Sequence, residues 1–215
     1  MTRGIVWFRR DLRLADHPAL ERAIQSHHAL LLVYVDNAAD NVYDASRAWL
    51  RRSLERLAED IRARGGELHV LAGDPETLIP TLAVETGATA VHISSLHEPE
   101  ADARDARIAA TLASGGIAMR RAGGRLLTDA DAVLTQSSTP FRVFTPFHKA
   151  ARPTWRHRPR EAPATLACGP LPSSLQGART TLDAPRPRWD SGFWDTWTPG
   201  EAAAVLEFLE LERQG

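Results

Sequence analysis

The sequence predicts an α/β fold: a doubly wound, parallel, five-stranded sheet of Rossmann-like type, followed by a long irregular connector and a terminal helix. Two observations predict the sheet. Short apolar runs alternate regularly with longer segments of helical period up to about residue 122. The run at residues 29–35 is apolar at nearly every position, which is typical of a strand covered on both faces. Right-handed crossovers between parallel strands follow from this alternation.

The strands are expected at residues 4–8, 29–35, 67–71, 89–93 and 117–120. Pro18 suits the first turn of the first helix, with Asp16 or His17 at its cap. Ser46 can cap the second helix, and a pair of glycines at 65–66 ends it.

A turn at residues 73–76 opens the third helix, and the fourth helix is expected over residues 98–114. In doubly wound sheets, ligands bind beyond the carboxyl ends of the strands, near the switch in strand order. Here these ends lead into residues 8–10, 36–37, 73–74 and 94–98.

The pattern changes after the fifth strand. An aromatic cluster of Phe141, Phe144 and Phe147 comes first, and a stretch rich in Pro, Arg and Trp then shows no clean period. We divide the chain into an α/β domain at residues 1–150, a connector at 151–198 and a terminal helix at 199–215.

The composition limits the classes of function. The chain has 215 residues and a formal net charge of −1, so it has no general positive field to hold nucleic acid, and DNA binding by this chain alone is not expected. Its one cysteine, Cys168, cannot form an intramolecular disulfide. With no secretory type of N-terminus and no apolar run long enough to span a bilayer, a cytoplasmic location without membrane contact is expected.

The most informative segment is Trp7 to Leu14, with the sequence WFRRDLRL, followed by Asp16. It is the end of a buried strand that continues into a turn dense in guanidinium groups. These arginines either form a structural network of ion pairs with the aspartates or present planar donors to a bound anion or ring.

This segment resembles the opening signature of the DNA photolyase and cryptochrome family. Four further stretches match the family in the same order: Gly73-Asp74-Pro75 with Leu78-Ile79-Pro80, His97-Glu98-Pro99 with Ala103-Arg104-Asp105, FRVFTPFHK at residues 141–149, and Trp197 to Ala202. The resemblance covers residues 4 to about 208, and it implies the fold of the photolyase N-terminal domain.

Photolyases split ultraviolet-induced pyrimidine dimers in DNA, using light absorbed by a reduced flavin adenine dinucleotide (FAD). The resemblance places FAD and the DNA surface in a C-terminal helical domain, and the sequence is expected to stop where that domain begins. No catalytic residue is therefore expected here, and repair by this chain alone is not expected. What the resemblance leaves to this chain is the site for a light-harvesting antenna chromophore.

By the resemblance, the antenna site consists of the arginine-rich turn, the end of the second strand and the loop after the fourth. The matching residues are Phe8, Arg9, Arg10, Asp36, Asn37 and Glu98. Arginine can stack on a fused ring and pair with its oxygens, whereas a carboxylate can accept from ring N–H groups. Structural alternatives stay open, because Arg13 and Asp16 can tie the turn together and Asp36 can cap a loop.

The pattern favours 8-hydroxy-5-deazaflavin over methenyltetrahydrofolate, or else a pocket that is empty. Folate-type members of the family tend to have an acidic residue where Ala101 stands. Deazaflavin-type members tend to have an acidic residue directly before a proline, as Glu98-Pro99 does.

Two other groups of residues carry weaker signals. His92 and His97 do not predict a metal site, because no cysteine or carboxylate stands at ligand spacing. The basic residues Arg152, Arg156, Arg158 and Arg160, with Trp155, could touch phosphates or stack a base. We favour the alternative that they form a solvated face of the connector or meet the family's second domain.

Three hypotheses follow for the whole chain. It is an antenna domain that stands alone, a binding module that pairs with a separate flavin-domain protein, or an unrelated nucleotide-binding protein. The last predicts a glycine-rich phosphate loop, which the sequence lacks.

The terminal helix is apolar on more than one face, at Val205, Leu206, Phe208, Leu209 and Leu211. It either folds onto its own sheet or expects a partner or self-association, and the position of the family's second domain favours the latter.

Overall fold

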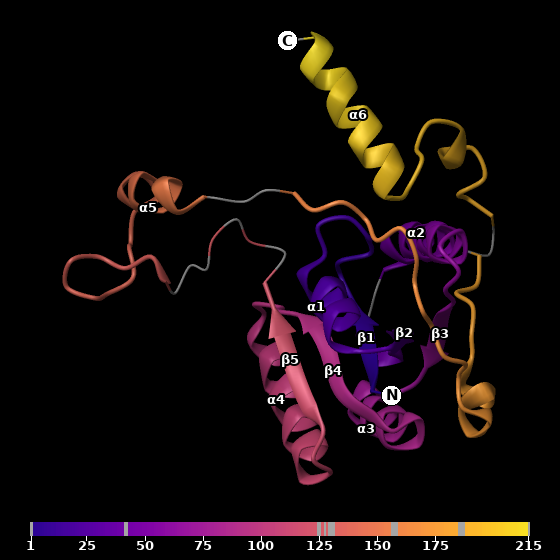
Figure 1. The fold of residues 1–215 in the computed structure, drawn as a ribbon. Helices are drawn as coiled ribbons and strands as arrows, with labels where there is room; N and C mark the ends of the chain where they lie inside the picture. Colours follow the sequence, from indigo (N-terminus) through magenta and orange to yellow (C-terminus); the bar gives the residue numbers. More distant parts are fainter. Residues whose placement is uncertain are drawn as a thin grey trace.

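The computed structural model describes residues 2–40, 43–123, 126, 128, 132–155, 159–184 and 188–214, with the side chains of the last helix described up to Glu207. Its centre is a sheet of five parallel strands in the order β3-β2-β1-β4-β5 (Figure 1). The strands are β1 (Arg3–Phe8), β2 (Ala29–Asp36), β3 (Leu68–Ala72), β4 (Ala88–Ser94) and β5 (Ala118–Ala122). The predicted fold class is confirmed.

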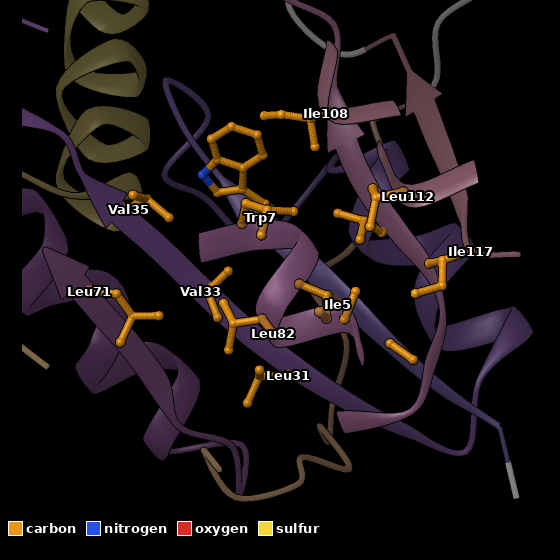
Figure 2. Close-up of a cluster of buried hydrophobic side chains, with 14 of the residues drawn as sticks. Ile5, Trp7, Leu31, Val33, Val35, Leu71, Leu82, Ile108, Leu112 and Ile117 are labelled. Atoms are coloured by element: carbon orange, nitrogen blue, oxygen red, sulfur yellow. The ribbon is translucent and has the colours of Figure 1, made fainter. Parts of the chain in front are cut away.

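Helices cover both faces of the sheet, because successive side chains of a strand point to opposite faces. Val6 and Phe8 face the layer of α1 (Pro18–Ser26) and α2 (Asp44–Arg62). Ile5 and Trp7 face the other layer. That layer consists of α3 (Pro75–Thr86) and α4 (Pro99–Ser114). Figure 2 shows part of this second core, in which Trp7, Ile108 and Leu112 are buried.

Side-chain capping bonds mark the starts of α1 and α3, where His17 and Asp74 accept from backbone N–H groups. Nδ1 of His17 accepts from the backbone N–H of Leu20 at 3.1 Å, so His17 is the cap of α1, and Pro18 is in its first turn as predicted. The prediction that Ser46 caps α2 is wrong. Asp44 and Ala45 already belong to the helix, so the cap position is Tyr43. Its side chain makes no capping hydrogen bond. An acidic residue in the first turn suits the helix dipole.

Several short helices were not predicted. The sequence FTPFHKAA forms α5 (Phe144–Ala151), which stands away from the sheet in Figure 1. The 3-10 helices are η1 (Ala38–Asp40), η3 (Arg152–Thr154), η4 (Ser173–Ala178) and η5 (Phe193–Asp195).

The connector lies over the α/β body, and backbone hydrogen bonds attach it. The backbone of Leu30 donates to Ala167 at 2.8 Å and accepts from Gly169 at 2.9 Å. Further along, the N–H of Thr180 donates to Val70 at 2.9 Å. Leucines 166, 171, 175 and 182 are buried against the body. The connector therefore follows a defined path, since burial of these side chains favours it.

The terminal helix α6 (Glu201–Gln214) stands beyond the carboxyl ends of the strands and does not lie on the sheet (Figure 1). Val205 and Leu206 are exposed. The side chains of Phe208, Leu209 and Leu211 lie outside the described ones, so their proposed contact with a partner stays a prediction. Within the described residues, no helix is long and apolar enough to cross a membrane.

Candidate functional site

A cavity of about 1010 Å³ opens at the carboxyl ends of β1 and β2. The position follows from topology. Strand β1 lies between β2 and β4, and the chain winds outward from it in both directions. The loops after these strands therefore diverge and leave a space between them. This is the edge of the sheet at which the sequence predicted a ligand site.

The inner wall of the cavity is aromatic. It includes Trp7 and Phe8 of β1 and Tyr34 of β2. Burial, together with the nearby carboxylates of Asp36 and Asp40, raises the pKa of Tyr34 to about 12, so the phenol stays neutral. Trp7 and Phe8 are buried and only Tyr34 of the three is partly exposed, so it is the Tyr34 ring, with its neutral hydroxyl, that a bound ring can contact.

Arg9 lines the cavity, but its terminal nitrogens donate to other residues of the protein and are not directed at a ligand. Nη1 donates to both carboxylate oxygens of Asp105 at 2.8 and 2.9 Å, and Nη2 donates to the carbonyl of Ser94. The guanidinium lies 5.0 Å from the ring centroid of Trp7. Burial lowers the pKa of Arg9, and the Asp105 carboxylate opposes that shift. These contacts match the structural alternative given above for this residue.

Arg10 differs from its neighbour. Its side chain is 62% exposed at the rim of the cavity, where Nη1 pairs with the carboxylate of Glu98. The fold thus brings together one residue of the turn after β1 and one of the loop after β4. These are the two predicted site residues that can change partner at least cost, because exposed ion pairs are weak.

Asp36 and Asn37 are not among the residues that line the cavity. The carboxylate of Asp36 accepts two hydrogen bonds from Arg47, at 3.1 and 2.9 Å. Oδ1 of Asn37 accepts from the backbone N–H of Ala39 at 3.1 Å, which shapes the loop. Four of the six predicted site residues therefore surround the cavity, namely Phe8, Arg9, Arg10 and Glu98. Their role in binding a ligand stays a prediction.

The turn that presents these residues is held by buried polar groups. Asp11 accepts from the backbone N–H of Arg9 at 2.9 Å and lies 2.9 Å from Nε2 of His17. Burial of Asp11 favours its neutral form, yet the hydrogen bond and charge of His17 outweigh this and hold the pKa of Asp11 well below its usual range. Arg13 donates to the carbonyl of Asp16 at 2.8 Å, so these two residues do tie the turn together.

The arginines of α4 were not predicted as site residues. Arg104 and Arg107 line the cavity with Ala101. Their spacing of three residues along a helix places them on one face, and this was the available signal. Arg104 lies 5.7 Å from the ring centroid of Trp7 and pairs with Asp40 at 3.2 Å. The rim of the cavity thus carries cations from two separate elements.

Two further helices contribute residues to the cavity, and neither contribution was predicted from the sequence. Helix α2 contributes Ser46, Trp49, Leu50 and Ser53. These positions follow helical spacing, so a second stripe on α2 could have been recognised. Helix α6 contributes Glu201 and Ala204, preceded by Gly200. Nothing in the local sequence of α6 indicates this return to the first strand.

The weaker sequence signals lead elsewhere. His92 is buried against His27, with 2.9 Å between their Nε2 atoms, and not against His97. Among the described residues no group of three potential ligands could hold a metal ion. Arg152 is exposed and Arg160 pairs with Glu21. Arg156 and Arg158 lie outside the described residues.

Comparisons with known proteins agree with this architecture. Residues 4–165 match the DNA photolyase family. A deoxyribodipyrimidine photo-lyase of Agrobacterium fabrum is 34% identical over 94% of this chain, which spans 43% of that relative. The crystal structure of a bacterial class III photolyase from Agrobacterium tumefaciens superposes with a TM-score of 0.83 at 32% identity, over 95% of this chain and 43% of that one.

A more distant structure shares the fold. It is an archaeal photolyase from Sulfolobus tokodaii, with a TM-score of 0.71 at 20% identity, over 85% of this chain and 40% of that one. That protein was described with two FAD molecules, with the implication of a novel light-harvesting cofactor.

Proposed function

We propose, from the premise that this chain belongs to the DNA photolyase family, that it binds a light-harvesting antenna chromophore in the cavity at the carboxyl end of its sheet. One observation carries the proposal. The cavity lies at the topological switch point and combines an aromatic inner wall with a rim of arginines. The description of the Sulfolobus tokodaii photolyase supports it by analogy of fold.

The residues present fit such a pigment. A fused aromatic ring needs apolar surface that a ligand can reach, and the partly exposed Tyr34 and Trp49 of the lining provide it. Carboxylate, phosphate or ring oxygens of the pigment need fixed donors, and Arg10 and Arg104 stand at the rim. When bound, the pigment supplies absorption of light; the protein holds the ring and limits its contact with water.

We propose a deazaflavin over a folate as this pigment. Ala101 lines the cavity where folate-type members of the family tend to carry a carboxylate. Glu98 stands at the rim directly before Pro99 and can accept from a ring N–H if its bond with Arg10 opens.

On this proposal, residues 1–150 are the antenna domain of a protein of light-dependent DNA repair. The collected energy would pass to FAD in the part of such proteins that this chain does not match. That part is a separate partner or a further stretch of the same protein, and the repair chemistry belongs there.

The test is a spectroscopic titration of the purified chain with FAD, 8-hydroxy-5-deazaflavin and methenyltetrahydrofolate. We expect saturable binding of one pigment with a shifted absorption band. Arg10→Ala or Glu98→Ala should weaken binding about tenfold, since each removes a charged hydrogen-bonding group. The matched control is Arg62→Ala, an exposed arginine at the end of α2 away from the cavity. Absence of saturable binding for all three pigments would disprove the proposed function.

A further inference from the structure

The start of α6 contacts the turn after β1, and the contact joins two walls of the cavity. The carboxylate of Glu201 accepts from the backbone N–H of Leu14 at 2.8 Å and from that of Ala15 at 2.9 Å. Both bonds are partly buried. A carboxylate that accepts two hydrogen bonds from backbone N–H groups is held more firmly than a neutral group that accepts one.

The two partners of this contact each carry cavity residues. Leu14 and Ala15 end the turn whose earlier residues Arg10 and Leu12 line one side. Glu201 and Ala204 of α6 line the same cavity. The Glu201 contact therefore joins α6 to the turn at a point where both border the cavity.

Gly200 allows the helix to approach closely. Its φ is +116°, a conformation that residues with a side chain rarely adopt. A Cβ at this position would lie 3.2 Å from Cβ of Arg56 on α2. The N-terminus of α6 is thus placed between α2 and the turn.

The segment before α6 is anchored independently of Glu201. Asp190 is buried and accepts from Nε1 of Trp194 at 3.0 Å and from Arg188 at 3.1 Å. The rings of Phe193 and Trp194 lie against Trp49 of α2, with centroids 6.3 and 6.1 Å away. Loss of the Glu201 contact therefore should free the end of the turn without releasing the whole connector.

We propose that Glu201 is a positioning residue for the chromophore cavity: by holding Leu14 and Ala15 it fixes α6 as a wall of that cavity. The inference rests on the proposed function for its ligand, whereas the contact itself can be tested without one. Glu201 does not have to touch the pigment.

The first experiment measures amide hydrogen exchange of the full chain at Leu14 and Ala15. We expect both backbone amides to be protected in the wild type. At least one of them should lose tenfold or more in protection in Glu201→Gln, because the glutamine side chain keeps only one acceptor oxygen. Glu207→Gln is the matched control, with the same change on an exposed residue of the same helix. Unchanged exchange in Glu201→Gln overturns the inference, whatever the pigment result.

The second experiment titrates the same variants with the pigment that the wild type binds and records its induced circular dichroism. We expect Glu201→Gln to weaken binding about tenfold and to reduce the induced signal, with an unchanged melting temperature and an unaffected Glu207→Gln. Glu201→Asp should restore part of the signal. Equal affinity and equal induced signal in Glu201→Gln overturn the positioning role. If the wild type binds no pigment, the proposed function fails and the positioning role fails with it, even where the exchange result stands.

Discussion

Two neighbouring residues of one motif, Arg9 and Arg10, lie in opposite environments. Arg9 belongs to an inner layer of buried polar groups that includes Asp105, Asp11 and His17. Arg10 belongs to an outer layer of exposed pairs around the cavity. Because burial removes water from a charge, the inner layer cannot change partners without a large cost, whereas the outer layer can. The motif therefore combines a structural half with a half that is available to a ligand.

The strongest test of this comparison is the removal of the buried carboxylate in Asp105→Asn. It leaves the guanidinium of Arg9 buried without its counter-charge, so we expect a loss of about 3–5 kcal/mol in the free energy of unfolding. The measurement is urea denaturation.

Asp102→Asn is the control for this variant, since Asp102 is on the same helix and half-exposed beside Arg121. It should cost less than about 1 kcal/mol. Equal losses in the two variants would contradict the division into inner and outer layers.

The histidine pair under α1 extends the comparison to pH. Burial, together with the nearby charges of His27, Arg120 and Arg22, lowers the pKa of His92 to about 4. The unfolded chain then takes up a proton near pH 6.5, which the folded chain does not. Stability should therefore fall as the pH drops from about 6.5 to about 4, by about 3 kcal/mol in total. Thermal denaturation across this range measures it, and His92→Gln should flatten the profile.

A smaller loss is expected from Asp11→Asn, which weakens the contacts with His17 and the backbone of Arg9. We expect about 1–3 kcal/mol. Because the pKa of Asp11 is lowered in the folded state, its contribution is present above its ordinary pKa of 3.8 and is lost as the pH falls below that value. Acid unfolding monitored by circular dichroism tests this. Asp40→Asn is the control, since Asp40 pairs with Arg104 near the surface, and it should leave the acid unfolding curve almost unchanged.

The smallest effect on stability is expected for Arg10→Ala, within about 1 kcal/mol, since its pair with Glu98 is exposed. The same variant should lose pigment affinity, as proposed above. A fluorescence-monitored melt beside the titration separates the two effects. A large loss of stability would show that Arg10 belongs to the inner layer and would break the comparison.

Much of the fold was predictable because its signals are local. The period of apolar residues gave all five strands to within one or two residues, and capping chemistry placed the starts of α1 and α3. The start of α2 was missed because helix-compatible residues precede Ser46. The helix α5 was missed because a short aromatic segment containing Pro146 has no clear period.

The candidate site was predictable only in outline. The ends of the strands indicated where a cavity lies, and the motif indicated Phe8, Arg10 and Glu98 near it. Asp36 lies at the strand end where the site was predicted, but its carboxylate accepts hydrogen bonds from Arg47 and does not line the cavity. The type of a residue and its position in a motif do not reveal which side chain elsewhere in the fold will form an ion pair with it.

The sequence by itself determined the order of strands and helices and the family, because both depend on patterns carried by neighbouring residues. The tertiary structure decided which of two adjacent arginines is buried and which helices line the cavity. Arg9 meets Asp105 across 96 positions, and Glu201 meets Leu14 across 187. Such contacts form only when the packed sheet brings the segments together, and the cost of burying a charge then selects the partner.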